Sequence, residues 1–363
     1  MEERLEKALE LLKELIRVPS FSNEEEKAAD IWEKWLLDQG VENVNRFHNN
    51  IYALSKNFDS SKPVLLLNSH MDTVKPVSTY TRNPFTPFLE DGKIFGLGSN
   101  DAGGSGVALA MAFLKLKDKQ DLNFNILFSI TANEERMGEL GMRAFLPHLR
   151  ENGIYPDLAI VGEPTGCRGG VAERGLVVCD AEVEGKAGHA ARNEGINAIY
   201  RACEDIETLK DLQLPIVSET LGPVKISVTM VEAGSQHNIV PDKCKYVVDI
   251  RTTDAYSNEK TVELLNEATK WSQLIPRSTR IRASVLAQDH PLFITAKKTG
   301  LETFISPTTS DMANMPDIPS IKLGPGESER SHTADEFIFI EEIRQGIKVY
   351  EAFILNLSSA MNN

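Results

Sequence analysis

The sequence is poor in the features that mark membrane, secreted and disulfide-bonded proteins. Its 363 residues contain only four cysteines, which are scattered and form no Cys-x-x-Cys pair; this favours a reduced protein with structural thiols. No apolar run approaches the ~18 residues of a membrane span. The N-terminal residues 1–7 lack the basic and then apolar segments of a secretion signal. We therefore expect a cytoplasmic protein with no membrane partner.

Positive charge is also scarce. Lys and Arg number 39 against 53 Asp and Glu, which gives a net charge of −14 at pH 7. Nucleic-acid-binding proteins need a basic surface for the phosphates, so nucleic acid is not expected as a partner. A small anionic substrate needs only one or two local cations and stays compatible with this charge.

The size and composition are those of a globular protein with two domains. Hydrophobic residues make up 41% of the chain and charged residues 25%, which is ordinary for globular proteins. A chain of 363 residues is too long for one ordinary hydrophobic core. We therefore expect two domains.

The first part of the chain alternates helical and strand patterns. Residues 3–17 carry apolar side chains at helical spacing, and Ser22 followed by Glu25 predicts a capping box at the start of a second helix. Nearly continuous apolar runs are typical of strands buried on both faces. Such strands are expected at 50–54, 64–67 and 125–130, and further helices at 104–118 and about 139–152. Strands that alternate with helices predict an α/β fold with a central, mostly parallel sheet.

The pattern changes near residue 173. Residues 175–184 alternate like a half-exposed strand, and the elements then follow the order β-α-β-β-α-β of a ferredoxin-like sandwich. We expect a helix at 195–210, strands at 223–230 and 245–251, a helix at 257–274, a strand at 279–285 and a last helix at 340–358. The predicted organisation is a larger domain of residues 1–173 and 287–363, into which an α+β domain of residues 174–286 is inserted.

Side chains that can bind metal follow several of the predicted strands. His70 and Asp72 end the strand that begins at Val64, and Glu134 and Glu135 follow the strand that begins at Asn125. The set is completed by Glu163 after the strand 158–161, Asp101 in the glycine-rich turn 98–104, and His332. Because the carboxyl ends of parallel strands meet at one edge of a sheet, we expect these side chains to lie close together.

Each of these residues has a structural interpretation when taken singly. An aspartate in a glycine-rich turn can cap a helix, and adjacent glutamates are often a solvated loop. Their joint placement at successive strand ends is hard to obtain by chance. Two histidines and three acids suit a pair of zinc or cobalt ions with one bridging carboxylate, and one glutamate remains as general base.

With these motifs the sequence resembles the dinuclear-zinc aminoacylases and peptidases, the family of acetylornithine deacetylase, succinyl-diaminopimelate desuccinylase and carboxypeptidase G2. The motifs are HMDTV, the glycine-flanked Asp, the Glu-Glu pair, GEPT, GHA and the final SHT. The resemblance covers essentially the whole chain. It implies that the larger domain is a zinc-peptidase-like catalytic domain that hydrolyses amides with two Zn²⁺ (or Co²⁺) ions, and that the peptide bond after Asp101 is cis.

The resemblance also implies the role of each residue in the larger domain. The metal ligands would be His70 and Glu163 for one ion, Glu135 and His332 for the other, and Asp101 as the bridge between them. Asp72 would orient His70 from outside the ligand set. Glu134 would take the proton from the attacking water.

The inserted domain resembles the family's lid and dimerisation domain, which implies a homodimer. His189 matches an imidazole that reaches into the partner subunit's active site and stabilises the oxyanion there. Asn238 matches a lid asparagine that contacts substrate. Arg251 matches a residue that binds the substrate carboxylate, a task that suits a bidentate guanidinium.

The substrate implied by the resemblance is a small N-acyl-L-amino acid. The segment Gly324–Glu336 and the modest length are most similar to acetylornithine deacetylase, an enzyme of arginine biosynthesis that acts on N-acetyl-L-ornithine. Two asparagines depart from the family pattern, Asn100 before the bridging Asp and Asn133 before the Glu pair. The segment Thr309–Asp311 resembles the desuccinylases instead.

Several alternatives therefore stay open. The substrate could be N-succinyl-ornithine, succinyl-diaminopimelate or N-acetyl-lysine, or the enzyme could be a dipeptidase or carboxypeptidase of the same family. A succinyl group needs an extra cation, for which Arg174, Lys186 and Arg192 are candidates. A metal-free binding protein is the last alternative, and the intact set of ligand positions argues against it.

Overall fold

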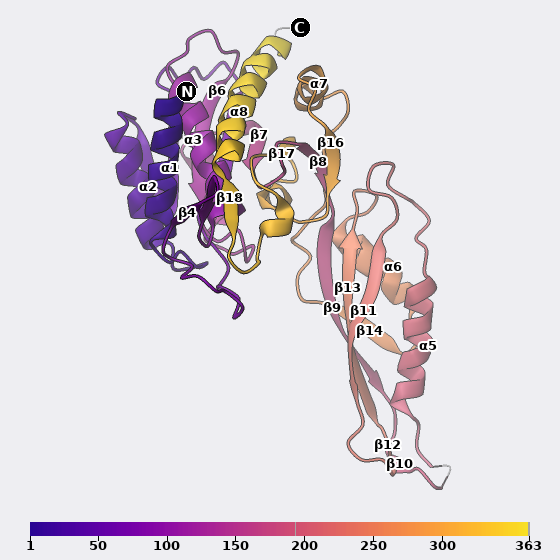
Figure 1. The fold of residues 1–363 in the computed structure, drawn as a ribbon. Coiled ribbons are helices and arrows are strands. Elements are labelled where there is room, and N and C mark those ends of the chain that lie inside the picture. The colour runs from indigo at the N-terminus through magenta and orange to yellow at the C-terminus, as the bar shows by residue number, and fades with distance from the viewer. Residues whose placement is uncertain (193, 362–363) are drawn as a thin grey trace. The chain divides into compact units, whose positions relative to one another are not determined.

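The computed structural model describes residues 1–192 and 194–361, and the chain falls into two compact units (Figure 1). The first unit comprises Met1–Val171, Leu286–Phe304 and Ser310–Asn363. The second comprises Ala172–Val285 and Ile305–Thr309. Each unit has a hydrophobic cluster of its own.

A large mixed sheet has most of its strands in the first unit. Its strand order is β1 (Val44–Phe47), β2 (Asn50–Leu54), β6 (Asn125–Thr131), β3 (Val64–His70), β7 (Pro156–Gly162), β17 (Ser320–Leu323), β8 (Gly169–Glu173) and β15 (Ser284–Val285), and β16 (Thr303–Ser306) also pairs with β8. The four strands β6, β3, β7 and β17 run parallel. All residues of β3 and β6 are buried, as their nearly continuous apolar sequences predict. The predicted α/β fold is confirmed.

Helices cover both faces of this sheet. Alternate residues of β3 and β6, such as Leu67 and Phe128, belong to one core cluster, and the intervening Leu66 and Leu127 belong to another. The first cluster lies under α1 (Glu2–Ile16), α2 (Glu26–Asp38), α3 (Gly104–Leu116) and α8 (Ile340–Ala360), and the second under α4 (Met142–Glu151). The period of two along a strand therefore divides the core into two layers.

The remaining elements of the first unit are small. They are α7 (Pro291–Lys298) and a three-stranded antiparallel sheet of β18 (Phe337–Phe339), β5 (Lys93–Phe95) and β4 (Phe88–Glu90). Among the helices of the described residues, none combines the length and the apolar character that crossing a membrane requires.

Phe128 offers a test of the larger core layer. Its ring is fully buried and stacks on Phe113 with 5.2 Å between the ring centroids. We expect Phe128→Ala to lower the free energy of unfolding by about 3–5 kcal/mol, because the lost burial and the residual cavity add. Urea denaturation measures the change, and Leu89→Ala, at an exposed position, is the matched control. An equal, small effect of both substitutions would contradict this packing.

The second unit has the strand and helix order of a ferredoxin-like sandwich. Its four-stranded antiparallel sheet has the order β11 (Lys225–Ala233), β13 (Lys243–Thr252), β9 (Gly175–Glu184) and β14 (Ser272–Pro276). The helices are α5 (Ala198–Asp211) and α6 (Asn258–Ala268), and the short strands β10 (Gly188–His189) and β12 (Ile239–Val240) pair with each other. A core of inward-facing strand residues such as Val177, Val248 and Ile250 lies under the helices.

Two predicted elements are wrong, and in each case a buried carboxylate explains the difference. The second helix begins at Glu26 and not at Ser22, because Glu25 turns its carboxylate to the backbone N–H groups of Asn23 and Asn133. The fourth strand of the second unit is 272–276 and not 279–285. Asp205 accepts hydrogen bonds from the backbone N–H groups of residues 270–272, so the chain leaves α6 early and begins β14 there.

Candidate metal centre

The predicted metal ligands of the first unit meet at one edge of the central sheet. His70 is the last residue of β3, Glu134 and Glu135 follow β6, and Glu163 follows β7. These strands are parallel neighbours, so their carboxyl ends open on the same edge of the sheet. Asp101 lies in the segment Ser99–Gly103, directly before α3.

One group of side chains gathers around His70. Its Nε2 atom lies 3.2 Å from Oδ1 of Asp101 and 3.9 Å from carboxylate oxygens of both Glu134 and Glu163. The imidazole is buried, and the peptide bond after Asp101 is cis, as the family resemblance implies. His70, Glu134 and Glu163 therefore form one group close enough to hold an ion, and His70, Asp101 and Glu135 form another.

A second group gathers around His332. Its Nε2 atom lies 2.9 Å from one oxygen of Glu135 and 3.7 Å from Oδ2 of Asp101. Asp101 thus turns one oxygen to His70 and the other to His332. That is the position a bridging carboxylate would take between two ions.

The electrostatics of the cluster fit a cation. Burial raises the pKa of Glu163 to about 8, opposed by His70 and reinforced by Asp101. Burial likewise holds the pKa of Glu134 well above its usual range. Carboxyl groups with such raised pKa values lack compensating positive charge, which a divalent ion among them would supply. Mixed imidazole and carboxylate ligands suit zinc, and cobalt prefers similar donors.

Asp72 supports the site in two ways. His70 Nδ1 lies 2.9 Å from the backbone oxygen of Asp72 but 3.5 Å from its carboxylate, so the main chain orients the imidazole. The carboxylate accepts hydrogen bonds from the backbone N–H groups of Glu134 (3.0 Å) and Glu135 (3.2 Å). It also accepts from the hydroxyl of Ser22 at 2.7 Å. Asp72 therefore fixes the loop that carries the Glu pair.

We expect Asp72→Ala to weaken zinc binding about 10- to 100-fold, because residues that support metal ligands have effects of this size. The substitution removes the acceptor for the N–H groups of Glu134 and Glu135. Ser22→Ala deletes one donor to the same carboxylate and leaves both of those bonds, so its effect is smaller. Competition with a zinc chelator measures both constants, and equal constants for the two variants would contradict this ranking.

Two buried acids near the Glu pair were not predicted. Asp311 accepts hydrogen bonds from Thr131 (2.8 Å) and Asn68 (2.9 Å), and its charge adds to the raised pKa of Glu134 after burial. Glu25 accepts from the backbone and side chain of Asn133, which has a positive φ of 60° directly before Glu134. The polar residues Asn68 and Thr131 inside apolar strands were the available signal for Asp311.

The predicted lid residues lie in the second unit. His189 in β10 pairs in register with Ile239 in β12, the residue after Asn238, so this two-stranded antiparallel sheet brings the two predicted residues close together. Arg251 lies near the end of β13, where its guanidinium is paired with Asp249 by hydrogen bonds of 2.8 and 3.1 Å. Their catalytic and binding roles stay predictions.

Comparison with known proteins gives a family for the whole arrangement. Residues 66–356 match the family described as Peptidase family M20/M25/M40. A Peptidase M20 domain-containing protein of Schizosaccharomyces pombe is 26% identical over 361 residues, covering 96% of this chain and 84% of that protein. Succinyl-diaminopimelate desuccinylase of Sulfurovum sp. is 30% identical over 263 residues, covering 70% of this chain and 69% of the relative.

Solved structures share the fold at lower identity. The aminopeptidase PepT of Bacillus cereus aligns with a TM-score of 0.77 at 21% identity, over 97% of this chain and 98% of that one. A dinuclear metal-binding M20 peptidase of Bacillus subtilis aligns with a TM-score of 0.75 at 17% identity, over 98% and 99%. The family match covers most of the chain and includes the residues of the metal centre. The protein is therefore an enzyme of the M20 family of metal-dependent peptidases and amidohydrolases.

Proposed function

We propose that this enzyme hydrolyses the amide bond of a small N-acyl-L-amino acid in the cytoplasm, using two zinc ions. The observation that carries the proposal is the position of Glu134. Its carboxylate lies beside His70 at the metal centre, and Asp72 holds its backbone N–H. A carboxylate fixed there, in addition to the five predicted ligands, is suited to be a general base.

The ligand set gives each residue a task. Ions held by His70, Asp101, Glu135, Glu163 and His332 would polarise the substrate carbonyl and favour ionisation of water at the site. Glu134 takes the proton of the attacking water as the new C–O bond forms at the acyl carbon. It returns that proton to the amine nitrogen as the C–N bond breaks, which leaves a free amine and a carboxylic acid that then releases its own proton to water.

The second unit would complete the reaction. We assign His189 to the developing oxyanion and Asn238 to the substrate, as the family resemblance implies. Arg251 would bind the substrate carboxylate. Because Asp249 occupies two of its N–H groups, Arg251 would either use its remaining donors or exchange partners when substrate arrives.

Two candidate substrates are supported, each by a different observation. N-acetyl-L-ornithine is the proposal from the segment Gly324–Glu336, which would place the enzyme in arginine biosynthesis. An N-succinyl amino acid is favoured by the relatives described as succinyl-diaminopimelate desuccinylases. It is also favoured by a cleft of about 420 Å³ whose lining includes the exposed cations Lys75 and Arg136 beside the acids Glu24 and Glu135.

Lys75 and Arg136 in this cleft are better candidates than Arg174 for the cation that would pair with the carboxylate of a succinyl group. The guanidinium of Arg174 already donates to the backbone oxygens of Leu221 and Pro223. Lys75 and Arg136 instead line a cleft together with a predicted metal ligand. A second carboxylate on the acyl group could pair with either of them.

The deciding experiment measures turnover by the zinc-loaded protein on N-acetyl-L-ornithine, N-succinyl-L-ornithine and a dipeptide, side by side. Cleavage of either N-acyl-ornithine with little dipeptide cleavage supports the proposal. If Lys75→Ala and Arg136→Ala lower kcat/KM for the succinyl substrate alone, the cleft binds the succinyl carboxylate. Cleavage of the dipeptide alone would refute the N-acyl amino acid and favour a peptidase.

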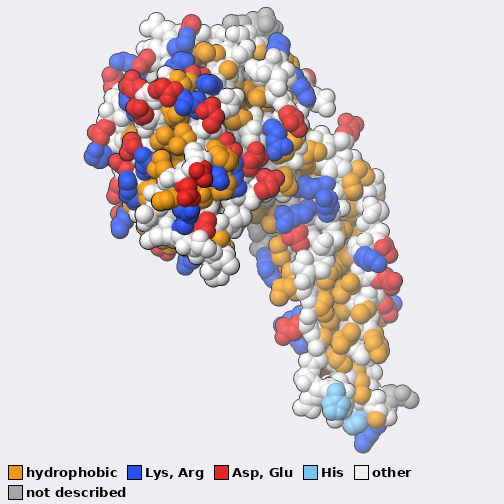
Figure 2. All heavy atoms as spheres, viewed as in Figure 1, with side chains coloured by type: hydrophobic (Ala, Val, Ile, Leu, Met, Phe, Trp, Pro, Cys, Tyr) orange, Lys and Arg blue, Asp and Glu red, His pale blue; other side chains and the backbone are white. Residues whose placement is uncertain are grey.

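We also propose a homodimer formed through the second unit. Its edge strand β11 carries the exposed apolar residues Met230 and Val231, and Ile275 lies exposed on β14 (Figure 2 shows hydrophobic side chains along this unit). Exposed edge strands are ready to pair with another chain. Light scattering should give twice the 40.3 kDa chain mass, and Val231→Lys should shift the protein towards the monomer.

A further inference from the structure

Two of the three ligands assigned to the second ion, Asp101 and His332, come from distant parts of the chain. Asp101 precedes α3, and His332 lies between β17 and β18. Neither is inside a strand of the central sheet, so the sheet itself does not fix their separation. The contacts between their two loops must do so.

Glu336 supplies the first set of contacts. It is almost fully buried, and its carboxylate accepts hydrogen bonds from the backbone N–H groups of Asn100 (2.8 Å), Asp101 (2.9 Å) and Gly98 (3.0 Å). Gly98 has a φ of +75°, which turns its N–H towards this carboxylate without a side-chain penalty. One side chain four residues after His332 thus fixes the main chain on which Asp101 sits.

Asn100 makes the second set of contacts between the two loops. Here the side chain belongs to the loop of Asp101, and the main chain that it binds belongs to the loop of His332. Its side-chain oxygen accepts from the backbone N–H of Glu327, and its side-chain nitrogen donates to the backbone oxygen of Glu327, both at 3.0 Å. The same nitrogen lies 3.4 Å from the hydroxyl of Ser331, next to His332. The fit is tight, since a Cβ atom at Gly326 would lie 2.5 Å from the Asn100 oxygen.

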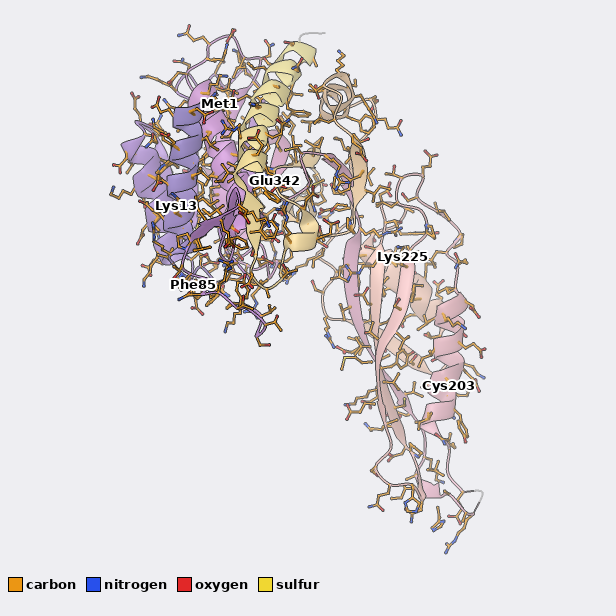
Figure 3. All side chains as sticks on the ribbon, viewed as in Figure 1. Met1, Lys13, Phe85, Cys203, Lys225 and Glu342 are labelled. Carbon is orange, nitrogen blue, oxygen red and sulfur yellow. The ribbon has the colours of Figure 1, made fainter. Side chains whose placement is uncertain are left out.

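The loop that carries His332 is also braced on its other side. Arg330 donates to Glu342 with two nitrogens, at 3.0 and 2.6 Å. Glu342, labelled in Figure 3, lies in the first turn of α8. The loop is therefore held between α8 and the segment before α3.

We propose that Asn100 and Glu336 form a reciprocal clamp that sets the separation of Asp101 and His332 and thereby the affinity for the second metal ion. Each loop contributes one side chain that binds the main chain of the other. Both are positioning residues, because they act on the metal through Asp101 and His332. The inference deepens the proposed function, since it depends on the two-ion site.

The clamp predicts a selective effect on the two ions. The ion assigned to His70 and Glu163 has both of these ligands at strand ends of the sheet, and only its bridging ligand, Asp101, lies on a clamped segment. The ion assigned to Glu135 and His332 depends on the clamped loop. The second ion has both Asp101 and His332 on clamped segments, so loosening the clamp should weaken its binding step more than that of the first ion.

The test is zinc titration of the metal-free protein against a chelator of known affinity, which resolves the two binding steps. We expect Asn100→Ala to weaken the second step about 10- to 100-fold, a range known for residues that support metal ligands, with a smaller effect on the first step. Glu336→Gln keeps one carbonyl oxygen for Asn100 and Asp101 but presents an N–H₂ group to the N–H of Gly98. It should weaken the same step.

The matched control is Asn123→Ala. Asn123 also donates from its side chain to a backbone oxygen, that of Ser358 at 2.7 Å, but lies outside the metal centre. We expect it to leave both zinc steps unchanged and to alter only stability. If Asn100→Ala behaves like Asn123→Ala, or weakens both steps equally, the clamp proposal is wrong.

The same experiment separates this inference from the proposed function. Because zinc stoichiometry is measured without substrate, a selective loss of the second ion stands whatever amide the enzyme cleaves. A parent protein that binds two zinc ions but cleaves no N-acyl amino acid would refute the proposed substrate without contradicting the clamp proposal. A parent that binds a single ion would overturn both.

Discussion

Glu134→Gln should bind two zinc ions with the affinity of the parent protein and lose about 10²- to 10⁴-fold in kcat, the usual contribution of a general base. The amide keeps the size and hydrogen-bonding shape of the carboxylate but cannot accept and return a proton. The backbone of residue 134 stays bound to Asp72 in the variant. Activity on the N-acyl-ornithine that the parent cleaves, together with zinc content, measures both expectations.

The geometry would also allow Glu134 to be a metal ligand, and the same variant tests this role. Its carboxylate lies near enough to His70 and Glu163 for the three to hold an ion together. If Glu134 were a ligand, Glu134→Gln would lose zinc along with activity. Glu26→Gln, an exposed carboxylate at the start of α2, is the control and should change neither. Retained zinc with substantial activity would remove Glu134 from the mechanism.

The parts of the site that follow strand ends could be predicted from the sequence. Buried parallel strands are readable as apolar runs, and the polar residues that end them must meet at one sheet edge. His70, Glu134 and Glu163 were found in this way. Asp101 was found because glycines surround it before an apolar helix.

The supporting contacts could not be predicted in the same way, because they join segments far apart in the chain. Asn100 stood out only as a departure from the family pattern, and nothing in its neighbourhood pointed to the main chain of Glu327. Similarly, the end of α6 depends on Asp205, which lies in another helix. Local sequence patterns predict helices, strands and the residues at strand ends. The hydrogen-bond partners of a buried polar side chain depend on the tertiary structure, which these patterns do not contain.

Removal of the metal should abolish activity, and added zinc or cobalt should restore it. Metal removal should also lower the free energy of unfolding. An ion that binds only the folded protein stabilises it by about 4 kcal/mol at a thousandfold excess over its dissociation constant. The metal-free protein should therefore unfold at a lower temperature. Calorimetry with and without chelator measures the difference.

The difference should widen as the pH rises. Burial raises the pKa values of Glu163 and Glu336 from 4.5 to about 8, so the metal-free folded state binds more protons than the unfolded chain between these values. Its unfolding free energy therefore falls as the pH rises from about 5 to 8. Metal binding requires deprotonated ligands, so its contribution grows over the same interval. Equal melting temperatures with and without metal at pH 8 would show that the site of Glu163 does not hold an ion.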